Sequence, residues 1–108
     1  MVVELQAAEV ARRLRSRSDG ILLLDVREPY ERGLASIEPS LHVPMPEVPD
    51  RLADLPRDRP IIVYCHSGVR SAMVAAYLEQ EGFPNVANLA GGIDAWSREV
   101  DPEVPRYL

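Results

Sequence analysis

Short apolar runs recur along this chain, and each is followed by a segment with the spacing of a helix. The clearest runs are Ile21–Val26, which only Asp25 interrupts, and Ile61–Tyr64. A strand with one face in water alternates apolar and polar residues, whereas an uninterrupted apolar run is typical of a strand buried on both faces. Such strands, when they alternate with helices, form a parallel sheet that helices cover on both faces. We therefore predict an α/β fold with a central, mostly parallel sheet.

Weaker patterns extend this alternation over the rest of the chain. Three further strands are short, and they are expected at residues 2–5, 41–44 and 86–89. Helical spacing is found at residues 7–16, 28–32, 48–55, 71–81 and 92–99. No internal repeat, low-complexity segment or linker divides the 108 residues, and a chain of this length suits one hydrophobic core. We therefore expect a single domain over residues 1–108.

The charge and the cysteine content argue against several functional classes. The formal net charge is -5, and all 12 cationic residues are arginines, so there is no lysine for a Schiff base or a phosphate-binding loop. An acidic chain disfavours nucleic acid as a partner, and no apolar run approaches the ~18 residues of a membrane span.

The only cysteine cannot form an internal disulfide, and its free thiol suits a reducing, cytoplasmic location. Two distant histidines and one cysteine lack the spacing of a metal site, so no metal is expected.

That cysteine, Cys65, lies where the buried strand Ile61–Tyr64 ends and a helix is about to begin. In parallel sheets, ligands bind at the carboxyl ends of the strands. Gly68 allows a tight turn in which successive backbone N–H groups face inward and form a nest for an anion. The N-terminus of the next helix favours the thiolate form of a nearby cysteine. A lone cysteine is more often a small core residue, but this flanking sequence favours a nucleophile.

The spacing from Cys65 to Arg70 discriminates between two chemistries. It is Cys-x4-Arg, whereas the spacing of cysteine phosphatases and arsenate reductases resembles Cys-x5-Arg. The longer loop makes a ring wide enough for a tetrahedral oxyanion, and the shorter ring fits one extra sulfur atom on the cysteine. We therefore favour sulfur transfer over phosphoryl transfer.

Three segments in a fixed order carry a family resemblance, and they are Leu23–Pro29, Cys65–Ser71 and Asn88–Trp96. Together they resemble the first signature, the active loop and the C-terminal signature of the single-domain rhodaneses, which are sulfurtransferases. The resemblance implies a three-layer rhodanese-like fold with a five-stranded, mostly parallel sheet and helices on both faces. The tail Val100–Tyr107 resembles that of rhodanese domains attached to enzymes that activate ubiquitin-like sulfur carriers.

The resemblance also implies a two-step sulfur transfer without a cofactor. The Cys65 thiolate attacks the outer sulfur of a donor, thiosulfate or a persulfide, and becomes a persulfide, and cyanide or a thiol then takes that sulfur. The persulfide is stabilised by the backbone N–H groups of His66, Ser67, Gly68, Val69 and Arg70. The Arg70 guanidinium orients the loop or meets an anionic donor. Two alternatives stay open: a relay in which a partner protein loads Cys65 for a sulfur-carrier protein, and a non-catalytic binding module.

Some residues near the loop allow two interpretations. Asp25, Arg27 and Ser71 form a wall of the site or only support the loop, and for the two charged residues we favour a structural ion pair. His66 donates to the substrate, or it is an exposed loop residue that contributes only its backbone N–H group. The Gly91-Gly92 pair brings the last helix close to the cysteine loop or forms an ordinary turn.

Two further segments raise separate questions. Relatives often carry Gly-His-Ile-x-Gly-Ala where this chain has residues 35–40, so Ser36 replaces the usual histidine and Ala35 and Pro39 replace the glycines. This departure does not affect the cysteine loop. The arginines at positions 12, 13, 15 and 17 form a solvated helix face, or they dock an acidic carrier protein.

Overall fold

A five-stranded sheet forms the centre of the computed structural model, which describes residues 2–17 and 19–108. Its strands, in chain order, are β1 (Val3–Leu5), β2 (Leu22–Asp25), β3 (Leu41–His42), β4 (Ile61–Tyr64) and β5 (Val86–Leu89). They lie in the spatial order β1-β5-β4-β2-β3, and every neighbouring pair is parallel. The two apolar runs occupy interior positions of the sheet as β2 and β4, and the predicted parallel α/β fold is confirmed.

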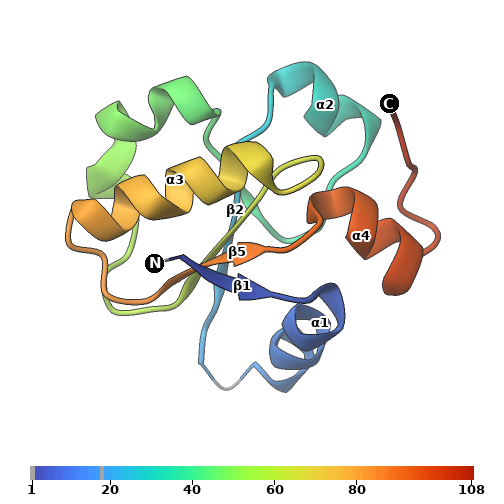
Figure 1. Cartoon of the computed structure of the whole chain (residues 1–108), viewed down its shortest axis with the longest axis horizontal. Helices are drawn as coiled ribbons and strands as arrows, with labels where there is room; N and C mark the ends of the chain where they lie inside the picture. Colours follow the sequence, from blue (N-terminus) through green and yellow to red (C-terminus); the bar gives the residue numbers. More distant parts are fainter. Residues whose placement is uncertain (1, 18) are drawn as a thin grey trace.

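Helices cover both faces of this sheet (Figure 1). They are α1 (Ala7–Ser16), α2 (Pro29–Leu34), α3 (Val69–Gln80) and α4 (Gly92–Glu99), together with a 3-10 helix, η1 (Met45–Asp54). The α1 and α4 helices pack together on one face, and α3 lies with η1 on the other. The α2 helix follows β2 and so begins at the carboxyl edge of the sheet. No helix in the described part of the chain has the length and apolar character needed to cross a membrane.

β4 has no charged residue, and β2 has only Asp25 at its end, because successive residues face opposite layers and both layers are buried there. In β4, Ile61 and Val63 belong to the core beneath α3. Ile62 and Tyr64 belong to the core beneath α1 and α4. The single sheet therefore divides two apolar cores, and no position of β4 is left facing water.

The helix predicted at residues 48–55 differs most from the structure. It begins at Met45, and it is a 3-10 helix with a kink at Arg51, whose φ of -119° is not helical. Pro49 lies inside it and has no backbone N–H group, so a continuous α-helical hydrogen-bond ladder cannot form there. The other predicted elements differ from the observed ones only at their ends, by one or two residues.

One of these differences changes the cysteine loop, because α3 begins at Val69 rather than at residue 71. Gly68 is the residue before the helix and adopts a φ of 101°, which a residue with a side chain rarely takes. The turn is therefore completed at Gly68. Val69 and Arg70 belong to the first helical turn, and the irregular loop spans only Cys65–Gly68.

Candidate active site

Cys65 lies directly after β4, and it is 1% exposed. Its sulfur accepts three hydrogen bonds, from Gly68 N at 3.1 Å, Ser71 N at 3.4 Å and the Ser71 hydroxyl at 3.3 Å. Both N–H groups lie at the N-terminus of α3, where backbone donors have no partner within the helix. The sulfur therefore caps α3, and negative charge on it is stabilised by three donors and by the helix dipole.

The N-terminus of α4 holds the cysteine loop from another side. Ile93 N donates to the carbonyl of Cys65 at 2.9 Å, and Asp94 N donates to the carbonyl of His66 at 3.1 Å. Gly92 permits this approach, because a Cβ atom there would lie 2.4 Å from the carbonyl oxygen of His66. Of the two interpretations of the glycine pair, the close approach to the loop is confirmed.

Asn88 of β5 holds the far end of the loop, and sequence reasoning did not single it out. Its Nδ2 donates to the carbonyl of Gly68 at 3.0 Å and to the Glu4 carboxylate at 3.0 and 3.2 Å. Asn88 is 2% exposed, and its amide nitrogen finds these partners, whereas its buried Oδ1 has none among the described residues. The parallel pairing of β4 with β5, which sets Val63 opposite Asn88, places this amide beside the loop. An asparagine in a buried strand was the available signal, but its partners depend on strand order.

Asp25 and Arg27 form the predicted ion pair at the end of β2, and both are completely buried. Arg27 Nε and Nη2 donate to the two carboxylate oxygens at 2.9 and 2.8 Å, and Arg32 adds a contact at 3.0 Å. Burial alone raises the pKa of the Asp25 carboxyl, but these donors outweigh burial and hold that pKa below its ordinary value. Arg27 Nη2 also donates to the carbonyl of Ala35 at 2.7 Å, so the pair joins β2 to the segment after α2.

Arg70 forms a two-point ion pair with Glu31 of α2, a residue that sequence reasoning missed. Arg70 Nη1 and Nη2 donate to Glu31 Oε1 and Oε2 at 2.7 and 2.9 Å. Glu31 is 3% exposed. The hydrogen bonds from Arg70 outweigh burial and lower the pKa of Glu31 to about 2. Arg70 was expected to orient the loop or to meet an anionic donor, and in the structure its charge is balanced by this carboxylate.

The other side chains of the predicted loop have different surroundings. Ser67 and Val69 are exposed. His66 is half-buried, and its ring stacks on Tyr107 with centroids 4.3 Å apart and planes inclined by 19°. His66 Nε2 is buried and has no hydrogen-bond partner among the described residues. The interpretation of His66 as a simply exposed residue is therefore wrong, and its donation to a substrate stays a prediction.

A cavity of about 450 Å³ adjoins this loop. It is lined by His66, Ser67, Asp94, Arg106, Tyr107 and Leu108. Four of these residues come from α4 and the C-terminal tail, and they lie at least 29 positions after Cys65 along the chain. Within residues 2–17 and 19–108, no group of three or more His, Cys, Asp or Glu side chains is arranged to hold a metal ion.

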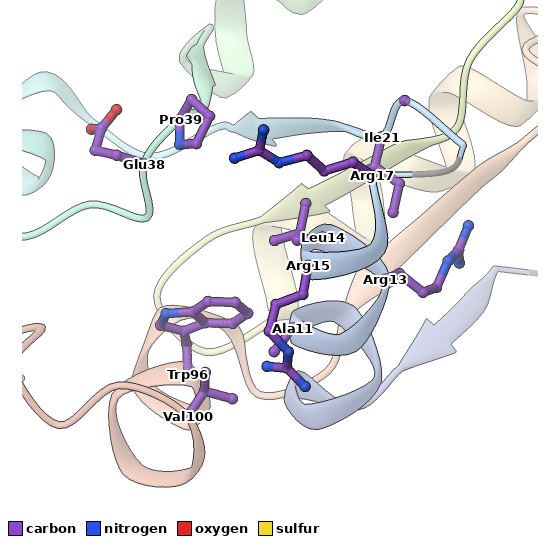
Figure 2. A pocket seen from close by; sticks show the side chains of 11 residues that line it. Ala11, Arg13, Leu14, Arg15, Arg17, Ile21, Glu38, Pro39, Trp96 and Val100 are labelled. Carbon is purple, nitrogen blue, oxygen red and sulfur yellow. The ribbon is translucent and has the colours of Figure 1, made fainter.

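A larger cavity, of about 720 Å³, lies between α1, α4 and the segment at residues 38–39 (Figure 2). Ile21, which lines it, precedes β2, whereas Cys65 follows β4, so this cavity lies at the opposite edge of the parallel strands. Figure 2 shows Trp96 of α4 on one side of the cavity and arginines of the α1 segment on the other. Arg13 is already paired with Asp19 at 2.7 Å. Docking of an acidic carrier on these arginines stays a prediction.

Comparison with known proteins agrees with the fold. The rhodanese-like domain family matches residues 6–99. A protein named sulfurtransferase from Allochromatium vinosum is 41% identical over 104 residues, which cover 96% of each chain. The thiosulfate sulfurtransferase GlpE of Pseudomonas paraeruginosa is 38% identical over 96 residues, which cover 89% of this chain and 84% of that protein.

A solved structure shows the same similarity in three dimensions. The crystal structure of a rhodanese-related protein from Thermoplasma volcanium matches with a TM-score of 0.84 and 32% identity. The match covers 97% of this chain and 99% of that one. The chain therefore belongs to the rhodanese-like domain family, and relatives of nearly the same length are named sulfurtransferases.

Proposed function

We propose that this protein moves sulfane sulfur from thiosulfate, or a related anionic donor, to a thiol or cyanide through a persulfide on Cys65. The observation that carries the proposal is the position of the Cys65 sulfur, which accepts three hydrogen bonds at the N-terminus of α3. These donors stabilise a thiolate before the reaction and a persulfide anion after it. The relatives named sulfurtransferase, one of them a thiosulfate sulfurtransferase, support the same reaction.

The proposed chemistry consists of two displacements at sulfur. In the first, the Cys65 thiolate forms a bond to the outer sulfur of thiosulfate while the bond between the two thiosulfate sulfurs breaks, and sulfite leaves with the electron pair. In the second, cyanide or a thiolate attacks the outer sulfur of the persulfide, and the Cys65 thiolate is regenerated. Neither step needs a metal or an organic cofactor, because the cysteine sulfur itself carries the transferred atom.

The charges around the loop support an anionic donor. The three guanidinium groups of Arg27, Arg32 and Arg70 are paired with three carboxylates, of Asp25, Glu31 and Glu38, so this cluster carries no excess charge. The positive potential at the Cys65 sulfur comes from the N-terminus of α3, where the N–H groups of Gly68 and Ser71 donate to the sulfur. Positive potential at a cleft raises the local concentration of an anionic substrate.

Two further expectations belong to this proposal. Residues 1–108 act as one rhodanese-like domain, which is supported by a single sheet whose strands come from residues 3 to 89. The protein works in a reducing, cytoplasmic environment, which a thiol that must stay free requires.

The test is the intact mass of the protein before and after incubation with thiosulfate, for the wild type and for Cys65→Ser. We expect the wild type to gain one sulfur atom, to lose it on addition of cyanide with formation of thiocyanate, and the variant to gain none. No gain by the wild type with thiosulfate, although Cys65 is still alkylated by iodoacetamide, would show that thiosulfate is not the donor. Loading by a persulfide-bearing protein would then favour the relay, and failure with every sulfane donor would leave a binding module.

A further inference from the structure

The C-terminal tail, residues 100–108, returns from the end of α4 towards α2 at the carboxyl edge of the sheet (Figure 1). Arg106 ties the tail to α4, because its Nε and Nη2 donate to the Asp94 carboxylate at 2.8 and 3.3 Å. Val104 and Tyr107 pack against the core beneath α1 and α4. The tail therefore has a defined place in the fold, and it brings Tyr107 to the cysteine loop.

Tyr107 makes both polar and aromatic contacts there. Its ring stacks on His66 at 4.3 Å between centroids. Its hydroxyl donates to Glu31 Oε2 at 2.7 Å and accepts from Arg27 Nη1 at 2.9 Å. Burial, the largest influence, raises the pKa of Tyr107 to about 12, so the hydroxyl remains a donor throughout the pH range of an assay.

Through these contacts Tyr107 reaches both ends of the segment that surrounds the sulfur. His66 directly follows Cys65, and Tyr107 contacts its ring. Arg70 lies at the other end, and both of its Nη atoms are bound by Glu31, the carboxylate that accepts the Tyr107 hydrogen bond. One phenol side chain therefore constrains the first residue after the cysteine directly and the arginine through a single intermediate.

We propose that Tyr107 is a positioning residue for sulfur transfer. It clamps His66 directly and Arg70 through Glu31, and it thereby keeps the backbone donors of the loop aimed at the sulfur. The inference rests on the proposed function and adds a residue to that same site. Hydrogen bonds weaken steeply when distance or angle departs from the optimum, so a small widening of the loop reduces the stabilisation of a sulfur anion.

A role confined to anchoring the tail predicts a different result. In that case loss of the hydroxyl lowers the stability of the protein but leaves the loop of the folded molecule, and its rate of reaction, unchanged. A positioning role predicts a lower rate at saturating donor, under conditions where the variant is fully folded. The two roles are therefore separable by kinetics.

The test uses two tyrosine-to-phenylalanine variants. Tyr107→Phe removes the hydroxyl bonded to Glu31 and Arg27 and keeps the ring that stacks on His66. Tyr77→Phe is the matched control, because Tyr77 lies on α3 and lines a separate cavity between α3 and η1. Both variants keep the apolar ring, so both are expected to fold.

The first measurement is the rate at which each protein gains sulfur in a single turnover, followed by intact mass over a range of thiosulfate concentrations. We expect Tyr107→Phe to lower the saturating rate at least about fivefold, with less than about a twofold change in the half-saturating concentration. We expect Tyr77→Phe to behave as the wild type. The second measurement, hydrogen exchange of the Gly68 and Ser71 amides in the reduced protein, needs no sulfur donor. We expect both amides to exchange at least about threefold faster in Tyr107→Phe.

The outcomes separate this inference from the proposed function. Sulfur uptake by Tyr107→Phe at the wild-type rate, or equal slowing by both variants, would overturn the positioning role while leaving the persulfide reaction intact. No sulfur uptake by the wild type would show that thiosulfate is not the donor and would refute that part of the proposed function, while the exchange of the Gly68 and Ser71 amides would still test the positioning role. Unchanged exchange of Gly68 and Ser71 in Tyr107→Phe would overturn the positioning of the loop by the Tyr107 hydroxyl through Glu31 and Arg70.

Discussion

Replacing Glu31 with glutamine removes a carboxylate that joins α2, α3 and the C-terminal tail. Glu31 accepts hydrogen bonds from both Nη atoms of Arg70, from the Tyr107 hydroxyl and from the backbone of Glu28. Glutamine has nearly the same shape, so the substitution removes the charge and creates no large cavity. The partly buried guanidinium of Arg70 then loses its ionic partner.

The size of the effect follows from the pKa of Glu31. That pKa falls from an ordinary value of 4.5 to about 2 in the folded protein. One pKa unit corresponds to about 1.4 kcal/mol, so the ionised carboxylate stabilises the fold by about 3 kcal/mol at neutral pH. Because the pKa is lowered by folding, this contribution is complete above about pH 4.5 and is lost as the pH falls towards 2. About 1 kcal/mol of it is gone by pH 4 and about 2 kcal/mol by pH 3.

The assay is urea denaturation of the wild type and Glu31→Gln at pH 7, pH 4 and pH 3. The fluorescence of Trp96, the single tryptophan and 8% exposed, reports unfolding. Other carboxylates titrate equally in both proteins, so the difference between them isolates Glu31. Glu47→Gln is the control, because Glu47 is exposed and lies 3.8 Å from Arg51, and exposed pairs contribute less than about 1 kcal/mol.

We expect the two free energies of unfolding to differ by about 3 kcal/mol at pH 7 and by about 1 kcal/mol at pH 3. A difference that stays constant between pH 7 and pH 3 would contradict a stabilisation by the Glu31 charge. Such a result would mean that the substitution acts through packing or hydrogen-bond geometry and not through the charge.

Three further changes test separate parts of the site. Gly92→Ala should lower the free energy of unfolding by about 2–4 kcal/mol in thermal or urea denaturation, because Gly92 has a φ of 62° and the new Cβ would collide with the His66 carbonyl. Gly33→Ala is the control, because a Cβ there meets nothing within 4 Å, and it should leave the stability unchanged or slightly higher. Asp25→Asn leaves Arg27 buried without an ionic partner and should cost about 3–5 kcal/mol of unfolding free energy, whereas a loss below about 1 kcal/mol would contradict the buried pair. Ser71→Ala removes one donor to the Cys65 sulfur, and we expect it to slow sulfur uptake by about 2–12-fold in protein that is fully folded. An unchanged rate would show that the hydroxyl does not act on the sulfur.

Much of the fold was predictable because it depends on local patterns. The apolar runs at β2 and β4 contain the information that both faces are buried, and the spacing of Val10 and Leu14 indicates the buried side of α1. The kinked 3-10 helix was not predictable from periodicity, because Pro49 permits either a break or a tighter helix and the packing against α3 decides between them.

The candidate site likewise contains residues whose positions follow from local sequence and residues whose positions depend on tertiary packing. Cys65, Gly68 and Ser71 are neighbours along the chain, so their placement around the sulfur follows from a strand, a glycine turn and a helix N-terminus. Asn88 and Tyr107 come from distant segments, and nothing in their local sequence indicates that they contact the loop. They reach it only through the order of the strands and the return of the tail.

Local sequence placed Cys65 at the end of a buried strand and before a helix N-terminus, and the loop length favoured sulfur transfer. Of the backbone donors expected from His66 to Arg70, only Gly68 N donates to the sulfur, and the second backbone donor is Ser71 N. The tertiary structure decided what the charged side chains do. It paired Arg70 with Glu31, enclosed Asp25 with Arg27 and placed the Tyr107 ring on His66. The physical reason is that backbone geometry is set over a few residues, whereas a long side chain pairs with whichever opposite charge the packing brings within about 3 Å, and that partner can come from any part of the chain.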